Sequence, residues 1–187
     1  MEYNGIAFEK ENYSGTKIKG YEYDNCTFHN CDFSNSSFSD CKFRNCKFDA
    51  CNLSMMKLVG TSLNNIHYKD CKILGVIFSD CHEFLFSPQF QNCILDYASF
   101  MDRKMNKTKF NGSSMKDVNF FRADLTGCSF EGCNLEGAVF NGTVLNNTDF
   151  VTASNYTIDP ELNKLKGARF SRYGVERLLD KYGIIIE

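Results

Sequence analysis

The stretch CTFHNCDFSNSSFSDCKFRNCKFDACNL, residues 26–53, carries a Phe or Leu at every fifth position from Phe28 onward. The same spacing extends outward from this stretch in both directions. The apolar residues at these positions are Phe8, Tyr13, Ile18, Tyr23, Phe28, Phe33, Phe38, Phe43, Phe48, Leu53, Leu58, Leu63, Tyr68, Ile73 and Phe78. A period of five is neither the 3.6 of an α-helix nor the 2 of a flat strand, so the chain must bend once in each repeat.

A second run with the same period includes the stretch ADLTGCSFEGCNLEGAVFNGTVLNNTDF, residues 123–150. Its apolar residues are Phe90, Leu95, Phe100, Met105, Phe110, Met115, Phe120, Leu125, Phe130, Leu135, Phe140, Leu145 and Phe150. The other positions of each repeat are mostly Asn, Asp, Ser, Lys, Gly or Glu, which are typical of exposed turns and short strands. The two runs therefore predict one repeat architecture over most of the chain.

Small side chains lie two positions before most of these apolar centres. They are Cys26, Cys31, Ser36, Cys41, Cys46, Cys51, Thr61, Cys71, Cys93, Ala98, Thr108, Ser113, Val118, Ala123, Cys128, Cys133, Ala138, Thr143 and Thr148. All ten cysteines occupy this position, Cys81 included. We interpret them as small buried hydrophobes in a reducing compartment. A metal or disulfide role is the alternative, although no C-x-x-C pair occurs in the sequence.

Both quoted stretches resemble the pentapeptide-repeat family, and the resemblance extends over about residues 6–155. It implies an all-β fold, a right-handed quadrilateral β-helix with one repeat on each wall and twenty residues in each coil. We expect this β-helix over residues 1–170. With that coil length, one wall should stack Phe90, Phe110, Phe130 and Phe150, and the opposite wall should stack Phe100, Phe120 and Phe140.

An irregular break at residues 79–90 separates the two runs. Its sequence, SDCHEFLFSPQF, adds two residues to the repeat and contains Pro88, which cannot donate a backbone hydrogen bond. The break predicts a bulge or a hinge, and a tolerated irregularity of one coil is the alternative. Its residues His82, Glu83, Phe84, Phe86 and Gln89 form a candidate secondary contact with a partner.

Residues 171–187 change character and predict a short C-terminal α-helix that closes the rod. Apolar residues at helical spacing are followed by Gly183, which suits the position after a helix end, and by an apolar tail. We expect a homodimer interface here, formed by Val175, Leu178, Leu179, Tyr182, Ile184, Ile185 and Ile186. The segment resembles the C-terminal helix and tail of the Qnr quinolone-resistance proteins, which dimerise there. A cap folded back on its own rod is the alternative.

The overall charge argues against a nucleic-acid-binding protein. Lys and Arg total 21 against 23 Asp and Glu, so there is no cationic surplus to drive direct binding to nucleic acid. The sequence also has no apolar run long enough to span a membrane, and its start, MEYNGIAFEKEN, lacks the features of a signal peptide. We therefore expect a cytoplasmic protein without a membrane partner.

The charge is unevenly distributed along the sequence. Residues 103–122 are rich in Lys and Arg, whereas residues 123–163 contain neither. The acidic residues of this second segment are Asp124, Glu131, Glu136, Asp149, Asp159 and Glu161. They predict an acidic partner-binding surface next to the C-terminal end, able to attract a basic DNA-binding groove. A routine soluble surface is the alternative.

The sequence contains no motif for catalysis. No nucleophile elbow, phosphate-binding loop or H-E-x-x-H motif occurs, so we expect a protein that is not an enzyme, with no catalytic residues, metal or cofactor. The resemblance to the Qnr, albicidin-resistance and microcin-immunity proteins implies a DNA mimic. Such a protein would bind DNA gyrase or topoisomerase IV and protect it from quinolone-like or toxin inhibitors. A structural or scaffold repeat protein that binds an unrelated protein is the alternative.

Overall fold

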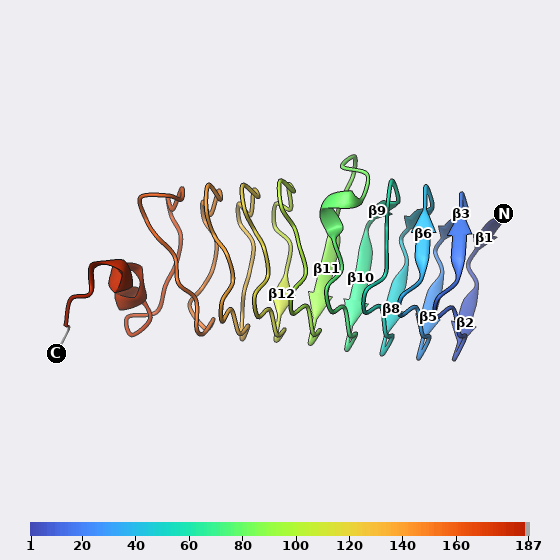
Figure 1. Ribbon diagram of the computed structural model, residues 1–187, viewed down its shortest axis with the longest axis horizontal. Helices are drawn as coiled ribbons and strands as arrows, with labels where there is room; N and C mark the ends of the chain where they lie inside the picture. The colour runs from blue at the N-terminus through green and yellow to red at the C-terminus, as the bar shows by residue number, and fades with distance from the viewer. Residues whose placement is uncertain (186–187) are drawn as a thin grey trace.

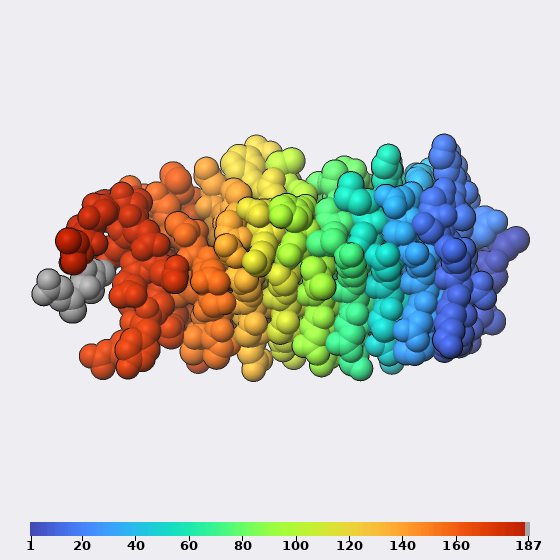
Figure 2. Space-filling model, turned by 60° about the horizontal axis from the view of Figure 1, so that its bottom comes forward, coloured from blue at the N-terminus to red at the C-terminus, as the bar shows by residue number. Residues whose placement is uncertain are grey.

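The computed structural model describes residues 1–185 and forms an elongated rod, with the two termini at opposite ends (Figures 1 and 2). All of its strand pairs are parallel, and in the N-terminal coils each residue pairs with the residue twenty positions further along the chain, as in Tyr3 with Tyr23. The fold is thus the predicted right-handed quadrilateral β-helix.

The strands are β1 (Glu2–Asn4), β2 (Ala7–Glu9), β3 (Lys17–Lys19), β4 (Glu22–Asp24), β5 (Thr27–His29), β6 (Ser37–Ser39), β7 (Lys42–Arg44), β8 (Lys47–Asp49), β9 (Ser62–Asn64), β10 (Ile66–Lys69), β11 (Pro88–Gln91) and β12 (Phe110–Asn111). Two 3₁₀ helices accompany them, η1 (Phe78–Asp80) and η2 (Val175–Tyr182). Elsewhere the coils are joined by single parallel bridges, such as Ser114 with Asn134.

These strands and bridges build four walls, which we number in chain order. Wall 1 contains the sheet β1-β4-β7-β9, wall 2 the sheet β2-β5-β8-β10-β11-β12, and wall 4 the pair β3-β6. Wall 3 is held by single bridges, beginning with Asn12 to Asp32. Because four repeats complete one coil, each wall receives one inward-facing apolar side chain per coil.

The core is built from columns of stacked rings. On wall 2 the column consists of Phe8, Phe28, Phe48, Tyr68, Phe90, Phe110, Phe130, Phe150 and Phe170, with neighbouring ring centres 4.7–5.2 Å apart. On wall 4, Phe78, Phe100, Phe120 and Phe140 stack at 4.7–5.5 Å. Rings of the two walls meet edge to face, which is a favourable aromatic geometry. Both predicted stacks are confirmed.

The polar residues of the repeat form the corners of the coil. The residue two positions after most centres adopts a left-handed backbone, as in Asn25 (φ 52°) and Gly137 (φ 70°). Asn, Asp and Gly tolerate this conformation best, which explains their frequency there. At Gly137 a side chain is also excluded by contact, because a Cβ atom would collide with Oδ1 of Asp117.

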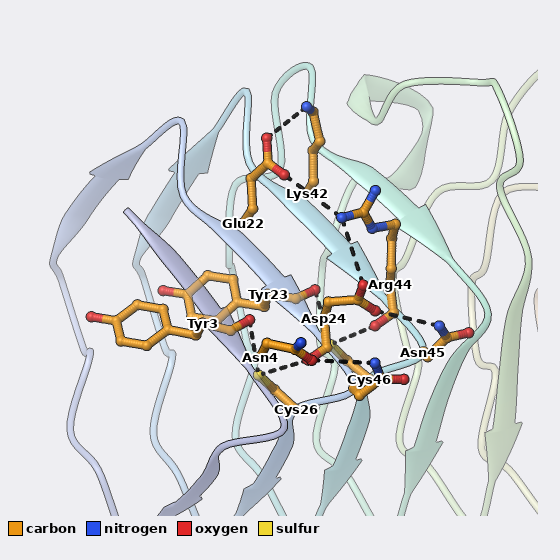
Figure 3. Close-up of polar contacts among 11 residues, drawn as sticks. Tyr3, Asn4, Glu22, Tyr23, Asp24, Cys26, Lys42, Arg44, Asn45 and Cys46 are labelled. Carbon is orange, nitrogen blue, oxygen red and sulfur yellow. Dashed lines mark hydrogen bonds and ion pairs between the residues drawn. The ribbon is translucent and has the colours of Figure 1, made fainter.

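The small residues of the repeat connect each coil to the previous one. The thiol of Cys46 donates to the carbonyl of Tyr23 at 3.4 Å, and that of Cys26 reaches the carbonyl of Tyr3 at 3.6 Å (Figure 3). The hydroxyls of Thr143 and Thr148 make the same bond, each at 2.9 Å. Cys and Thr at this position therefore add a hydrogen bond between coils, whereas Ala98, Val118, Ala123 and Ala138 fill the same place without one. All ten cysteines are buried and free of disulfides, which confirms their interpretation as core residues.

The break is a bulge within one coil. β10 pairs with β11 at an offset of 22 residues, in register from Ile66 and Pro88 onward, and the ladder continues beyond it with Lys72 opposite Ile94. The two additional residues are absorbed within residues 81–87, which project from the outline of the other coils (Figure 1). Pro88 opens β11, a place in a strand where a missing N–H group is tolerated.

The C-terminal helix differs in type from the prediction. η2 is a 3₁₀ helix rather than an α-helix, and the N–H of Arg177 donates to the carbonyl of Gly174, three residues earlier. Three residues per turn place Leu178 and Lys181 on the same face, and this face lies against the last coil. Leu178 is half-buried there, and Lys181 reaches the carboxylate of Asp159. Gly183 ends the helix in the left-handed conformation, as predicted.

Candidate acidic surface, bulge and C-terminal patch

The predicted acidic residues are spread over several walls of the rod. Asp124 adjoins Leu125 on wall 1, Glu131 and Asp149 adjoin the ring column of wall 2, and Glu136 adjoins Leu135 on wall 3. Asp159 and Glu161 lie in the loop that precedes the last coil. The stacking of coils therefore distributes the acidic sequence around the rod.

Most of these carboxylates are paired with cations from neighbouring coils or from η2. Glu136 lies 2.9 Å from Nζ of Lys116, and Asp149 lies 3.0 Å from Nη1 of Arg169. Asp159 and Glu161 share Nζ of Lys181, each at 2.7 Å, and these hydrogen bonds lower the pKa of both carboxyls. Lys116 and Arg169 stand twenty residues from their partners, so reading the sequence at that spacing reveals both pairs.

Two of the predicted acidic residues carry no such neutralising partner. Within residues 1–185, no cationic group lies within 4.0 Å of the carboxylates of Asp124 and Glu131. Asp124 instead accepts hydrogen bonds from the backbone and hydroxyl of Thr126, at 3.0 and 2.6 Å. Glu131 accepts one from Asn111 at 3.4 Å. Within the predicted acidic set, the unpaired negative charge therefore lies on Asp124 and Glu131.

The rod also has a groove that is lined mostly by residues other than the predicted acidic ones. It lies on wall 2 across β8, β10, β11 and β12, and it is lined by Lys47, His67, Gln89, Lys109 and Asn111, among others. Glu131 lies at its edge and is the one predicted acidic residue that contributes to it. The acidic residues otherwise stand on the outside of the rod, a shape suited to the groove of a partner rather than to a small ligand.

The bulge divides its predicted contact residues into two groups. His82, Glu83 and Phe84 are exposed, and Phe84 retains 68% of its accessible surface. Phe86 does not face a partner, which corrects the prediction. It is 7% exposed, and its ring packs edge-on against Phe78 at 6.1 Å. The additional length of the coil lets this ring turn into the core.

Gln89 is also engaged within the chain. It is half-buried at the start of β11, and its Oε1 accepts a hydrogen bond of 2.7 Å from the backbone N–H of Lys109. Of the predicted bulge contacts, His82, Glu83 and Phe84 thus remain available to a partner.

Arg103 begins the Lys- and Arg-rich segment 103–122, but it is a core residue rather than a surface cation. It occupies the small-residue position of its repeat, two residues before Met105, and is 9% exposed. One Nη atom donates to the carbonyls of Ser79 and Cys81, the latter at 2.5 Å. The guanidinium lies 5.5 Å from the centre of the Phe86 ring. Alignment of the coils at an offset of 22 would have placed Arg103 over Cys81.

The predicted dimer residues form an exposed apolar patch at the C-terminal end. Val175, Leu179, Tyr182 and Ile184 are exposed, and Ile185 retains 87% of its accessible surface. Leu178 is half-buried, as described above, and Ile186 lies outside the described residues. The hydroxyl of Tyr182 donates to Glu161 at 2.9 Å, which fixes its ring at the edge of the patch. The patch is therefore held in place by the last coil and remains open to a partner.

No helix among residues 1–185 has both the length and the apolar character needed to cross a membrane. The same residues contain no group of three or more His, Cys, Asp and Glu side chains arranged to hold a metal ion.

Comparison with solved structures shows a close likeness in fold. A trypsin-treated, singly substituted form of QnrB1, a plasmid-mediated fluoroquinolone resistance protein, superposes with a TM-score of 0.76 at 20% identity, covering 100% of this chain and 98% of that one. Full-length QnrB1 gives a TM-score of 0.56 at 20% identity, covering 98% and 100%. HetL, a pentapeptide repeat protein involved in heterocyst differentiation regulation from the cyanobacterium Nostoc sp. strain PCC 7120, gives 0.54 at 14% identity, covering 90% and 88%.

The sequence comparisons agree with the architecture. No curated protein matches the chain. Two family models do: a pentapeptide repeat region at residues 21–100 and pentapeptide repeats at residues 119–154. Together these matches span more than half of the chain and include most of the repeats of the β-helix. The chain belongs to the pentapeptide-repeat family.

Proposed function

We propose that this protein binds DNA gyrase or topoisomerase IV as a DNA-like rod and protects the enzyme from quinolone-like or toxin inhibitors. The observation that carries the proposal is the end-to-end likeness to QnrB1, which includes the C-terminal element as well as the coils. The protein would act by occupying a surface, without catalysis. Its partner would be the topoisomerase itself rather than nucleic acid.

The electrostatic part of the proposal rests on Asp124 and Glu131. Ion pairs already neutralise Glu136, Asp149, Asp159 and Glu161, so these four contribute little field at a distance. Within the predicted acidic set, these two unpaired carboxylates form a modest charge, and dimerisation through the C-terminal patch would double it. The proposed partner-binding unit is therefore the homodimer.

The direct test is a titration of the protein into a gyrase supercoiling reaction, with and without a quinolone. We expect supercoiling to recover in the presence of the drug, or to be inhibited in its absence. The first result indicates protection, and the second indicates competition with DNA. If neither gyrase nor topoisomerase IV responds at any protein concentration, the proposal is wrong.

The charge contribution is tested with the variant Asp124→Asn/Glu131→Gln. Both amides keep the local hydrogen bonds, and we expect topoisomerase affinity to fall by about tenfold, since each complementary surface charge contributes about 1 kcal/mol or less. Surface plasmon resonance at low and high salt would measure it, with Glu136→Gln as the matched control. Equal binding by the double variant and the unmodified protein would exclude DNA mimicry.

Dimerisation is tested with Leu179→Asp. Leu179 is exposed and is not among the residues packed against the core, so the variant should fold normally. A carboxylate in an apolar interface is costly to desolvate, so we expect monomers by light scattering with an unchanged β circular-dichroism spectrum. The matched variant Val59→Asp, at an exposed apolar residue far from the patch, should leave the assembly intact. Monomers in the unmodified protein would contradict the dimer.

The second candidate function is a structural or scaffold protein that binds an unrelated protein. The observation that favours it is the pairing of the four carboxylates described above, which reduces the acidic character of the surface. If the supercoiling titration shows no effect, the next experiment is partner capture with the Leu179→Asp variant as a reference. Capture of an unrelated protein would support this candidate.

A further inference from the structure

We propose that Arg103 is a positioning residue that holds the bulge, residues 81–87, in one preformed shape, and that this shape presents Phe84 and Leu85 as a rigid apolar contact for the topoisomerase. The proposed partner rests on the function given above, whereas the role of Arg103 within the bulge does not.

The first argument is the place of Arg103 in the coil. It stands where the repeat mostly has Cys, Ser, Thr, Ala or Val, directly after Cys81 and before Ala123 in the same column of the solenoid. Among the buried residues of 1–185, Arg103 carries the one charged side chain. Its guanidinium reaches back to the carbonyls of Ser79 and Cys81, where the coil with the two additional residues enters the bulge.

The second argument is the kind of contact that Arg103 makes. Within residues 1–185 no carboxylate lies within 4.0 Å of this nearly buried cation. Burial also raises the pKa of Cys81 to about 12, so the neighbouring thiol is neutral and supplies no counter-charge. The guanidinium is instead satisfied by the carbonyls of Ser79 and Cys81 and by the face of Phe86. A buried cation is retained at such a cost when it fixes a conformation.

The third argument is the order of the bulge itself. The backbone N–H of Phe84 donates to Nδ1 of His82 at 3.2 Å, and Oγ of Ser87 donates to the carbonyl of Leu85 at 3.1 Å. Ser87 also accepts a bond of 2.7 Å from the N–H of Asn65, which ties the bulge to the previous coil. Leu85 is held at φ 58°, a left-handed conformation that a Leu side chain rarely adopts. These hydrogen bonds offset the strain of the left-handed backbone at Leu85 and hold the bulge in one conformation.

The exposed side chains indicate what that shape is for. Phe84 and Leu85 are adjacent, retain 68% and 56% of their accessible surface, and make no core contact. Glu83 lies beside them, and Asp80 precedes the bulge in η1. An apolar tip with flanking carboxylates complements a basic protein surface that contains an apolar recess. A preformed tip also avoids the entropic cost of ordering a loop on binding.

The role of Arg103 is tested without any partner. Because the chain contains no Trp, Phe84→Trp introduces a single Trp at the tip, which can be excited selectively over the nine Tyr residues. In that background we expect time-resolved anisotropy to show only the slow tumbling of the rod. Adding Arg103→Lys, which keeps the charge but cannot reach both carbonyls and the ring together, should produce a fast local component. Arg122→Lys, at an exposed arginine paired with Asp102, is the matched control and should not.

The partner is tested by a double-mutant cycle on topoisomerase affinity. We expect Phe84→Ser and Arg103→Lys each to weaken binding by about tenfold, and the double variant to bind no more weakly than either one. Additive losses, or unchanged anisotropy in Arg103→Lys, would overturn the proposal. If the unmodified protein binds no topoisomerase, the assignment of the partner fails together with the proposed function, and the anisotropy result alone decides the role of Arg103.

Discussion

Phe130→Ala is expected to lower the free energy of unfolding by about 3–5 kcal/mol, the usual cost of opening a cavity of this size in a closely packed core. Phe130 is fully buried and lies in the middle of the wall 2 column, 5.1 Å from the ring of Phe110 and 5.0 Å from that of Phe150. Backbone hydrogen bonds fix the spacing between this coil and its neighbours, so the neighbouring coils cannot move in to fill the cavity. Urea denaturation followed by circular dichroism would measure the loss.

Phe121→Ala is the matched control for this measurement. Phe121 is an outward-facing residue of the same kind, and its ring lies under the guanidinium of Arg122 at 4.8 Å. Its truncation should cost no more than about 1 kcal/mol. A Phe130→Ala variant as stable as the control would show that the register of the coils is wrong.

Alkaline pH is expected to destabilise the protein strongly. Burial raises the pKa of the thiols of Cys46, Cys81, Cys128 and Cys133 from 9.0 to about 12. Above pH 9 the unfolded chain releases these protons while the folded chain retains them, so the stability present below pH 9 is lost as pH rises. We expect a loss of about 1 kcal/mol for each thiol between pH 9 and pH 10. Urea denaturation at both pH values measures it.

The variant Cys128→Thr/Cys133→Thr is the matched control for the alkaline effect. Thr143 and Thr148 show that the same position accepts a hydroxyl with the same hydrogen bond. The variant should therefore be nearly as stable as the unmodified protein at pH 7 and lose about 2 kcal/mol less on going to pH 10, since two of the buried thiols are removed. A pH dependence equal to that of the unmodified protein would show that these thiols are accessible to solvent.

The period of five predicted the fold because the same three structural roles recur in nearly every repeat. An inward ring such as Phe110, a small donor such as Thr148 and a left-handed corner such as Asn25 each recur at fixed offsets, so local sequence determines the coil. The repeat also predicted which rings stack. The type of the C-terminal helix was not predictable in this way, because this segment lies outside the repeat and is attached by contacts such as those of Lys181 with Asp159 and Glu161.

The candidate site was less predictable because it depends on contacts between coils. Counting charges along the chain suggested a continuous acidic surface, but Lys116 and Arg169 arrive from coils one turn away and neutralise two of its residues. Arg103 was misplaced for a related reason. The insertion raises the offset between these coils from 20 to 22 residues, so a reading at the regular period of twenty does not bring Arg103 to Cys81.

The ring column of wall 2 passes the bulge without interruption, since Tyr68 and Phe90 stack at 5.2 Å although 22 residues separate them. The inserted residues are therefore accommodated locally, and the strand ladder and the ring column continue in register on both sides of them. In evolutionary terms, the corners can gain, lose or exchange segments independently of the interior. A lineage of such rods can acquire a new recognition element by a short insertion, without rebuilding the scaffold that carries it.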